Sequence, residues 1–358
     1  MRNLIDITDL TNGELQGIMD TACDIILRPD DYREKCRGKK LATLFFEPST
    51  RTRLSFEAAM YELGGNVIGF SDAGSSSVMK GETLADTAKV IGSYADVIAM
   101  RHPKDGAAFL ASQYAGVPLI NAGDGGHCHP TQTLADLLTI YRAKGGFNGL
   151  TVGFCGDLKY GRTVHSLIAA LARYEGVKAV LISPEELRLP DYIKTGVMAK
   201  ANMGYEEVGS IGEAIDKLDV LYMTRIQRER FADPGDLPDL DDDFMLTAAK
   251  MKAAKPDMCV LHPLPRVNEI STDVDDDKRA QYFEQVKNGK FMRMALILFL
   301  LERLGESERE TDEKILSDDS LDCTNARCIT HFERAYKPLF VKKPDGKITC
   351  KYCESEIS

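Results

Sequence analysis

The sequence lacks a long apolar run, a basic stripe and a leader with a basic start and an apolar centre. Its longest apolar stretch, residues 294–301, has eight residues, which is too short to span a bilayer and predicts a buried helix segment. Residues 1–15 do not have the pattern of a secretory signal. We therefore expect a cytoplasmic protein.

Positive charge is also in short supply. The net charge is -10 at pH 7, and phosphate backbones attract basic proteins, so we expect no nucleic acid partner and no membrane partner. A local cluster of arginines can still bind a small anion, because the field close to a cluster need not follow the net charge.

Disulfide bonds are not expected, although the chain has nine cysteines. Five of them are scattered and four gather near the C-terminus, and without a secretory signal a disulfide framework is improbable.

Length and patterning predict two α/β domains with an appendage. A chain of 358 residues, 44% hydrophobic and 28% charged, has the composition of a globular protein too long for one ordinary domain. Strands are expected at residues 41–46, 66–70, 96–100, 117–121, 150–155, 179–183, 220–223 and 258–262. Helical patterns lie at residues 54–63, 133–141, 163–173 and 291–304. This alternation favours parallel sheets.

Basic and hydroxyl residues follow many of these strands. Residues 47–53 (EPSTRTR) stand between a predicted strand and a predicted helix. A helix start offers N–H groups and a positive dipole end, and hydroxyls with an arginine there make a phosphate cradle. On this segment alone, an ordinary Ser/Thr helix cap with solvated arginines is the better explanation.

Other polar motifs are weak one by one, since surface loops and basic turns explain them equally well. They lie at residues 75–83, 100–103, 125–133, 156–163, 224–227 and 262–266. His127 and His129 flank Cys128, but no further metal ligand is near in sequence, so we favour His129 as a hydrogen-bond donor to a substrate. Together, the motifs predict a cleft between two domains that binds two anions.

Seven segments in order resemble the catalytic chain of aspartate carbamoyltransferase over residues 3–304. They are FFEPSTRTRLSFEAAM, KGETLADT, MRHP, HPTQTLADLLTIY, GDLKYGRTVHSL, LYMTRIQRERF and LHPLPRVNEI. The related ornithine enzymes share the STRTR-type motif but have a cysteine in the late loop, where this chain reads HPLP. Arg162 and Arg225 also suit a dicarboxylate better than a cationic amino acid.

The resemblance implies a fold, a reaction and a set of site residues. The fold is α/β with two doubly wound parallel-sheet domains, and the reaction is carbamoyl transfer from carbamoyl phosphate to L-aspartate, the committed step of de novo pyrimidine biosynthesis. The implied catalytic residues are Arg51, Thr52, Lys80, Arg101 and His129. The implied substrate-binding residues are Ser49, Thr50, Ser76, Gln132, Arg162, Arg225, Gln227, Leu264 and Pro265.

The same resemblance implies how the chain assembles. Ser76 and Lys80 would reach a neighbouring subunit's site, which gives a homotrimer with shared active sites, and the chemistry needs no cofactor. Two alternatives stay open: transfer to ornithine or another amine, and a silent paralogue that acts as a scaffold.

The last cysteines predict a structural zinc site. Cys323-x4-Cys328 and Cys350-x2-Cys353 are two pairs with zinc spacing, and four thiolates close the metal to substrate. A module this small needs its metal to fold, and His331 is a spare ligand. The segment resembles the zinc domain of the aspartate carbamoyltransferase regulatory chain, fused here without the nucleotide-binding domain, so a structural or assembly role is expected.

These observations predict four regions. A carbamoyl-phosphate-binding domain occupies residues 1–132 and is completed by a helix at 287–304, and an aspartate-binding domain occupies residues 133–286. An acidic linker follows at residues 305–320 and a zinc-binding module at residues 321–358.

Overall fold

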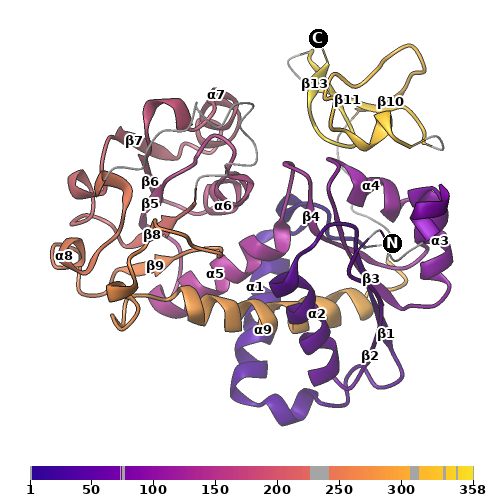
Figure 1. Cartoon of the computed structure of the whole chain (residues 1–358), viewed down its shortest axis with the longest axis horizontal. Coiled ribbons are helices and arrows are strands. Elements are labelled where there is room, and N and C mark those ends of the chain that lie inside the picture. Colours follow the sequence, from indigo (N-terminus) through magenta and orange to yellow (C-terminus); the bar gives the residue numbers. More distant parts are fainter. Residues whose placement is uncertain are drawn as a thin grey trace. The chain divides into compact units, whose positions relative to one another are not determined.

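A computed structural model describes residues 2–357 apart from residues 73, 75–76, 226–241, 307–313, 334–335 and 344–345 (Figure 1). Internal contacts divide the chain into two compact units. Unit 1 comprises Met1–Thr131 and Lys290–Ser358, and unit 2 comprises Gln132–Gly289. The helices α5 (Pro130–Lys144) and α9 (Tyr282–Leu301) each contribute residues to both units.

Unit 1 is built on a four-stranded parallel sheet with the order β2-β1-β3-β4. Its strands are β1 (Lys40–Phe45), β2 (Asn66–Phe70), β3 (Val97–His102) and β4 (Leu119–Asp124). Its helices are α1 (Asn12–Leu27), α2 (Thr50–Glu62), α3 (Leu84–Gly92) and α4 (Ala107–Ser112). Pro118 directly precedes the edge strand β4, as a proline in this position predicts. Because the strands are parallel, the loops that follow them leave from one edge of the sheet.

Unit 2 contains a five-stranded parallel sheet with the order β7-β6-β5-β8-β9. Its strands are β5 (Thr151–Cys155), β6 (Lys178–Ile182), β7 (Gly204–Val208), β8 (Val220–Met223) and β9 (Cys259–Leu261). Its own helices are α6 (Arg162–Leu171), α7 (Asp191–Ile193) and α8 (Ala248–Met251). β8 and β9 are buried at every residue, as expected for strands covered on both faces. The two parallel sheets confirm the predicted fold class.

The apolar run near the end of α9 is buried, as its composition predicts. The helix starts nine residues before the predicted residue 291, because its first half is polar and shows no apolar run. Within the described part of the chain, no helix has the length and apolar character needed to cross a membrane.

A small antiparallel sheet forms the end of the chain, here named the C-terminal module (residues 314–357). Its strands are β10 (Lys314–Ser317), β11 (Leu339–Lys342), β12 (Ile348–Cys350) and β13 (Glu356–Ile357), paired in that order. β10 lies inside the stretch 305–320 that the sequence predicts as a linker, and its residues pair with β11. The strand is not evident from the sequence, because it has only four residues in an acidic stretch and its pairing partner, β11, follows more than twenty residues later.

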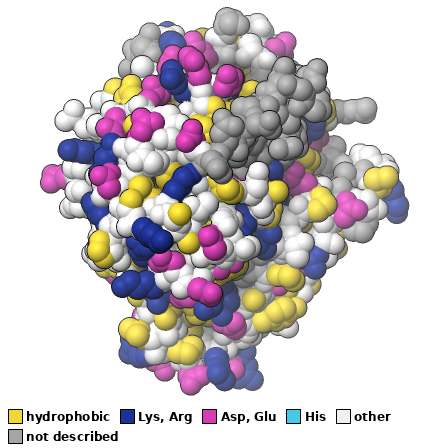
Figure 2. Space-filling view, turned by 60° about the vertical axis from the view of Figure 1, so that its left-hand side comes forward, with side chains coloured by type: hydrophobic (Ala, Val, Ile, Leu, Met, Phe, Trp, Pro, Cys, Tyr) yellow, Lys and Arg dark blue, Asp and Glu magenta, His cyan; other side chains and the backbone are white. Residues whose placement is uncertain are grey.

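The C-terminal module belongs to unit 1 and packs on the rest of that unit, near α4 in Figure 1. Ile329 and Tyr352 share an apolar cluster with residues of β3 and α4, and the Tyr352 ring meets the Phe109 ring edge-on at 5.3 Å. On the described surface in Figure 2, acidic and basic side chains are interspersed.

Close packing beneath the unit 1 sheet predicts a sharp difference between two glycines. A Cβ at Gly92 would lie 1.8 Å from the backbone oxygen of Ala115, whereas a Cβ at Gly17 would meet nothing within 4 Å. We expect Gly92→Ala to lower the free energy of unfolding by more than about 1 kcal/mol. Gly17→Ala, in the helix α1, should raise it by about 0.5–1 kcal/mol. Urea denaturation of both variants measures this, and an unchanged midpoint for Gly92→Ala would contradict the packing described.

Candidate active site and metal centre

The start of α2 is a helix N-terminus that no side chain caps. Ser49 occupies the N-cap position with φ -153° and ψ 85°, and its side chain makes no capping hydrogen bond. The ordinary Ser/Thr cap that the sequence favoured is therefore not realised. The N–H groups of the first turn and the positive end of the helix dipole are the elements of an anion site. Ser49 and Thr52 are half-buried here, and Arg51 is exposed.

Phe46 and Glu47, which lie just before α2, hold Arg101 beside the start of this helix. Its Nη2 lies 2.7 Å from Oε1 of Glu47, and its carbonyl oxygen accepts a hydrogen bond from the Phe46 N–H at 2.9 Å. Nε of Arg101 is buried and has no hydrogen-bond partner in the described structure. Glu47 thus holds the guanidinium group at Nη2, while the buried Nε–H remains available to donate a hydrogen bond.

His102, next to Arg101, has a different role. Its Nδ1 accepts a hydrogen bond from the Lys104 N–H at 3.1 Å, and its ring packs edge-on against Phe46. Burial lowers the pKa of His102 to about 4, so the ring is neutral at physiological pH and acts as a structural acceptor.

His129 lies directly before α5, with Pro130 as the first helical residue, a position that tolerates proline. The side chain is 6% exposed, and its Nδ1 is 3.4 Å from Oγ1 of Thr131. Arg293 Nη2 donates to the same Thr131 oxygen at 3.4 Å, and the guanidinium of Arg293 stacks over the ring of Phe56 in α2. The turn that carries His129 is therefore connected to α2 through Arg293.

The turn before His129 contains three potential metal ligands, Asp124, His127 and Cys128. The Asp124 carboxylate already accepts from the Cys128 N–H, the Gly106 N–H and the Asn121 side chain at 2.8–3.1 Å. Burial by itself lowers the pKa of His127, but Cys128 and the Asp124 carboxylate outweigh it and raise that pKa. Protein donors thus saturate Asp124, and the cluster is an internal hydrogen-bond network.

In unit 2, two predicted arginines follow neighbouring parallel strands. Arg162 starts α6 after β5, and Arg225 follows β8, which pairs with β5. The two loops are joined at their base, because the Asp157 N–H donates to Oγ1 of Thr224 at 3.0 Å. Gly156 has φ +114°, and a Cβ there would lie 2.3 Å from the Thr224 oxygen. Arg162 and Arg225 therefore follow the ends of two neighbouring strands, in loops that are bonded to each other.

A chain of hydrogen bonds connects Gln132 with the loop at Leu264, all within unit 2. Asp136 Oδ1 accepts from Gln132 at 2.7 Å and from Gln285 at 2.6 Å, and Oε1 of Gln285 accepts from the His262 N–H at 2.9 Å. Nδ1 of His262 then accepts from the Leu264 N–H at 2.8 Å. Leu264 has the left-handed φ of 48° that non-glycine residues rarely adopt, and this network holds its backbone N–H in place.

Glu269 completes that network at its far end. Its Oε1 lies 2.7 Å from Nε2 of His262. Burial raises the pKa of Glu269, but the hydrogen bonds from His262 and from two backbone N–H groups outweigh it and lower the pKa. Sequence reasoning missed Asp136, Glu269 and Gln285, since buried polar residues spread along the chain carry no motif.

The remaining predicted residues are not all brought together. Ser76 and Gln227 lie outside the described residues. Lys80 is exposed at the end of a short 3-10 helix (Ser77–Lys80). Gln132 groups by contacts with unit 2, whereas Thr131 belongs to unit 1. Pro265 is exposed after a cis peptide bond with Leu264.

The four C-terminal cysteines converge on a metal centre. Their sulfur atoms all lie within 4.8 Å of one another and are buried, with Cys323–Cys353 at 3.4 Å and Cys328–Cys350 at 4.0 Å. Tetrahedral zinc with bonds of about 2.3 Å places thiolates about 3.8 Å apart, so the donor set fits zinc. His331 is exposed and is not part of this group.

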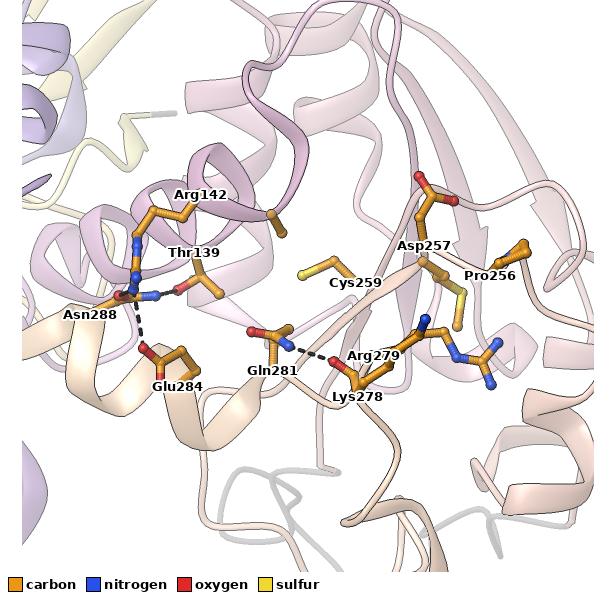
Figure 3. A pocket seen from close by; sticks show the side chains of 12 residues that line it. Thr139, Arg142, Pro256, Asp257, Cys259, Lys278, Arg279, Gln281, Glu284 and Asn288 are labelled. Carbon is orange, nitrogen blue, oxygen red and sulfur yellow. Dashed lines mark hydrogen bonds and ion pairs between the residues drawn. The ribbon is translucent and has the colours of Figure 1, made fainter.

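A surface cavity of about 480 Å³ lies elsewhere in unit 2 (Figure 3). It is lined at the start of β9 by Cys259 and by polar side chains that pair with one another. Arg142, for example, donates to Glu284 at 3.1 Å. None of the predicted site residues lines this cavity.

Comparison with known proteins assigns each part of the chain to a domain family. Residues 2–142 match the carbamoyl-P binding domain of aspartate/ornithine carbamoyltransferase, and residues 148–300 match its Asp/Orn binding domain. Residues 317–358 match the metal binding domain of the aspartate carbamoyltransferase regulatory chain.

Individual relatives agree. The aspartate carbamoyltransferase catalytic subunit of Lachnoclostridium phytofermentans is 60% identical over 301 residues, which are 84% of this chain and 98% of that subunit. The catalytic subunit of M. jannaschii aspartate transcarbamoylase superposes with a TM-score of 0.79 at 48% identity, covering 86% of this chain and all of that one. The Trypanosoma cruzi enzyme in complex with carbamoyl phosphate and aspartate gives 0.79 at 39% identity, over 84% of this chain and 96% of that one.

The chain thus belongs to the aspartate/ornithine carbamoyltransferase family, on the side of the aspartate carbamoyltransferase catalytic chains, and continues into a metal-binding domain of the regulatory-chain type.

Proposed function

We propose that the chain transfers the carbamoyl group of carbamoyl phosphate to the amino nitrogen of L-aspartate. The products are N-carbamoyl-L-aspartate and phosphate. A C–N bond forms as the amine attacks, the C–O bond to phosphate breaks, and the amine proton leaves, with the departing phosphate as a candidate acceptor. The observation that carries this proposal is the uncapped start of α2 with Arg101 held beside it by Glu47.

Unit 1 binds carbamoyl phosphate in this proposal. Ser49, Thr50, Arg51 and Thr52 hold the phosphate through N–H groups, hydroxyls and a guanidinium. Arg101 and His129, together with Thr52, polarise the carbamoyl carbonyl and stabilise the oxyanion that forms on attack. The buried, unpartnered Nε of Arg101 supports this role, because a buried donor without a partner is costly until a ligand accepts from it.

Unit 2 binds the amino acid. Arg162, Arg225 and Gln227 grip the two carboxylates of aspartate, and guanidinium groups suit carboxylates because their paired N–H donors match two oxygens. The Leu264 carbonyl, beside Pro265, and Gln132 orient the carbamoyl NH2. The shared hydrogen-bond chain through Asp136 supports that pairing. Most of the rate comes from holding two anionic reactants and neutralising their charge.

Assembly, location and metal complete the proposal. The chain forms a homotrimer in which Ser76 and Lys80 reach a neighbour's site, and the exposure of Lys80 is compatible with that reach. It works in the cytoplasm, in the committed step of pyrimidine biosynthesis. The nine cysteines all lie in the described part of the chain and form no disulfide bond there, which suits a reducing compartment. Zinc on the four C-terminal thiolates organises the C-terminal module and takes no part in the chemistry.

An acceptor assay tests the reaction. Purified protein should transfer the carbamoyl group to L-aspartate and not to L-ornithine. Arg51→Ala should lower kcat/KM by at least about 100-fold, because it removes a charged donor from the phosphate. The control is Arg33→Ala, which changes an exposed arginine paired with Asp30 and should leave the rate unchanged. Transfer to ornithine alone would contradict the proposed acceptor, and transfer to neither by folded protein would favour the scaffold alternative.

Metal analysis tests the zinc site. Wild-type protein should hold about one zinc ion per chain. Cys328→Ser should remove it, because three thiolates and a hydroxyl bind zinc more weakly. Cys23→Ser, in α1 and outside the cluster, should keep the full content. Equal zinc in both variants would mean that the four thiolates are not the ligands.

A further inference from the structure

The C-terminal module contacts three segments of unit 1 that adjoin predicted site residues. Glu333 Oε2 accepts from the Leu84 N–H at 2.7 Å, at the start of the helix that follows Lys80. The backbone of Cys328 forms an isolated parallel β-bridge with the backbone of Asp105, which lies in the loop after Arg101. In the turn before His129, Nε2 of His127 is 3.8 Å from Glu354.

Asp105 is the centre of these contacts and is 4% exposed. Its backbone N–H donates to the Arg327 oxygen at 3.1 Å, and its backbone oxygen accepts from the Ile329 N–H at 2.9 Å. One carboxylate oxygen accepts from Nδ2 of Asn325 at 2.9 Å, and the other accepts from the Gly126 N–H at 2.7 Å. A single side chain thus joins the C-terminal module to the turn before His129.

The loop of Asp105 and the turn before His129 also hold each other. The Gly106 N–H donates to Oδ2 of Asp124 at 2.8 Å, and the Asp105 carboxylate holds the Gly126 N–H in return. Gly125 fits between them only without a side chain, since a Cβ would lie 1.9 Å from Oδ1 of Asp105. A shift of the Asp105 carboxylate therefore moves the turn that places His129.

The metal ligands flank the residues that make these contacts. Asn325 and Arg327 lie between Cys323 and Cys328, and Tyr352 lies between Cys350 and Cys353. The backbone of Tyr352 packs against Gly106, where a Cβ would lie 2.6 Å from it. Order at the metal centre therefore sets the position of the surface that Asp105 contacts.

We propose that Asp105 is a positioning residue that couples the metal-bound C-terminal module to the turn of His129, and through it to the binding of carbamoyl phosphate. The inference rests on the proposed function for the role of His129. The neighbouring Arg327, with Nε 3.8 Å from Asp105 and a side chain 60% exposed, adds little, because solvent screens it. The hydrogen bonds carry the coupling.

Reversing the polarity of one hydrogen bond tests this coupling. Asp105→Asn turns an amide donor toward either Gly126 or Asn325, and Asn325→Asp sets two carboxylates against each other. In the double variant, the new amide oxygen at position 105 accepts from Gly126 while the new NH2 group donates to the carboxylate introduced at position 325, so the pattern is restored. Each single variant should weaken the binding of carbamoyl phosphate by at least about fivefold, and the double variant should recover most of that loss.

Comparing the binding of carbamoyl phosphate with that of inorganic phosphate distinguishes a specific effect on the turn of His129 from a general loss of structure. Calorimetric titration with inorganic phosphate reports on the helix start at Ser49–Thr52, and its affinity should stay within about twofold of wild type in all variants. Zinc removal with a chelator should weaken carbamoyl phosphate binding in the wild type and add little in Asp105→Asn, because both break one connection. Lys347→Ala, which breaks an ion pair with Glu356 inside the module, is the matched control and should change neither affinity.

Three results would overturn the inference: wild-type affinity in the folded single variants, no recovery in the double variant, or an equal loss of phosphate affinity. Binding is measured without aspartate, so its outcome is independent of turnover. A wild-type protein that binds carbamoyl phosphate but transfers nothing to aspartate would contradict the proposed function alone.

Discussion

Parallel strands send the loops that follow them to one edge of a sheet, and the site described here depends on that constraint. In unit 1, the loops after β1 and β4 carry Ser49 and His129, which are eighty residues apart in sequence, and Arg101 lies at the end of β3. In unit 2, the loops after β5 and β8 carry Arg162 and Arg225. In both units, the alternation of strands and helices is enough to bring these residues to the same edge of the sheet.

The sheet places the site residues only approximately, and hydrogen bonds between neighbouring segments fix their positions. Glu47 holds Arg101, Thr224 holds the start of the Arg162 loop, and His262 holds the backbone N–H of Leu264. In each case a polar group of one segment bonds to the segment that it positions, so stability and site geometry depend on the same bonds. Such preorganised donors need no rearrangement when charge develops on a substrate.

The sequence indicated candidate site residues, but it did not indicate the residues that hold them in position. Parallel α/β units and the cysteine cluster follow from local patterns, because strand alternation and thiol spacing are local properties. Asp105, Asp136 and Glu269 escaped prediction, because each acts through backbone N–H groups or side chains that only the fold brings near. β10 escaped for the same reason, since a four-residue strand is defined by its partner and not by its own pattern.

If hydrogen bonds from the C-terminal module position the turn of His129, the protection of that turn depends on the metal. Amide hydrogen exchange of zinc-loaded and zinc-free protein measures this most directly, and peptides covering residues 124–129 and 49–56 report on the turn and on the cradle helix. The account predicts faster exchange at Gly126 and its neighbours without zinc, with the peptide at 49–56 unchanged. Equal exchange at residues 124–129 in both forms would contradict it.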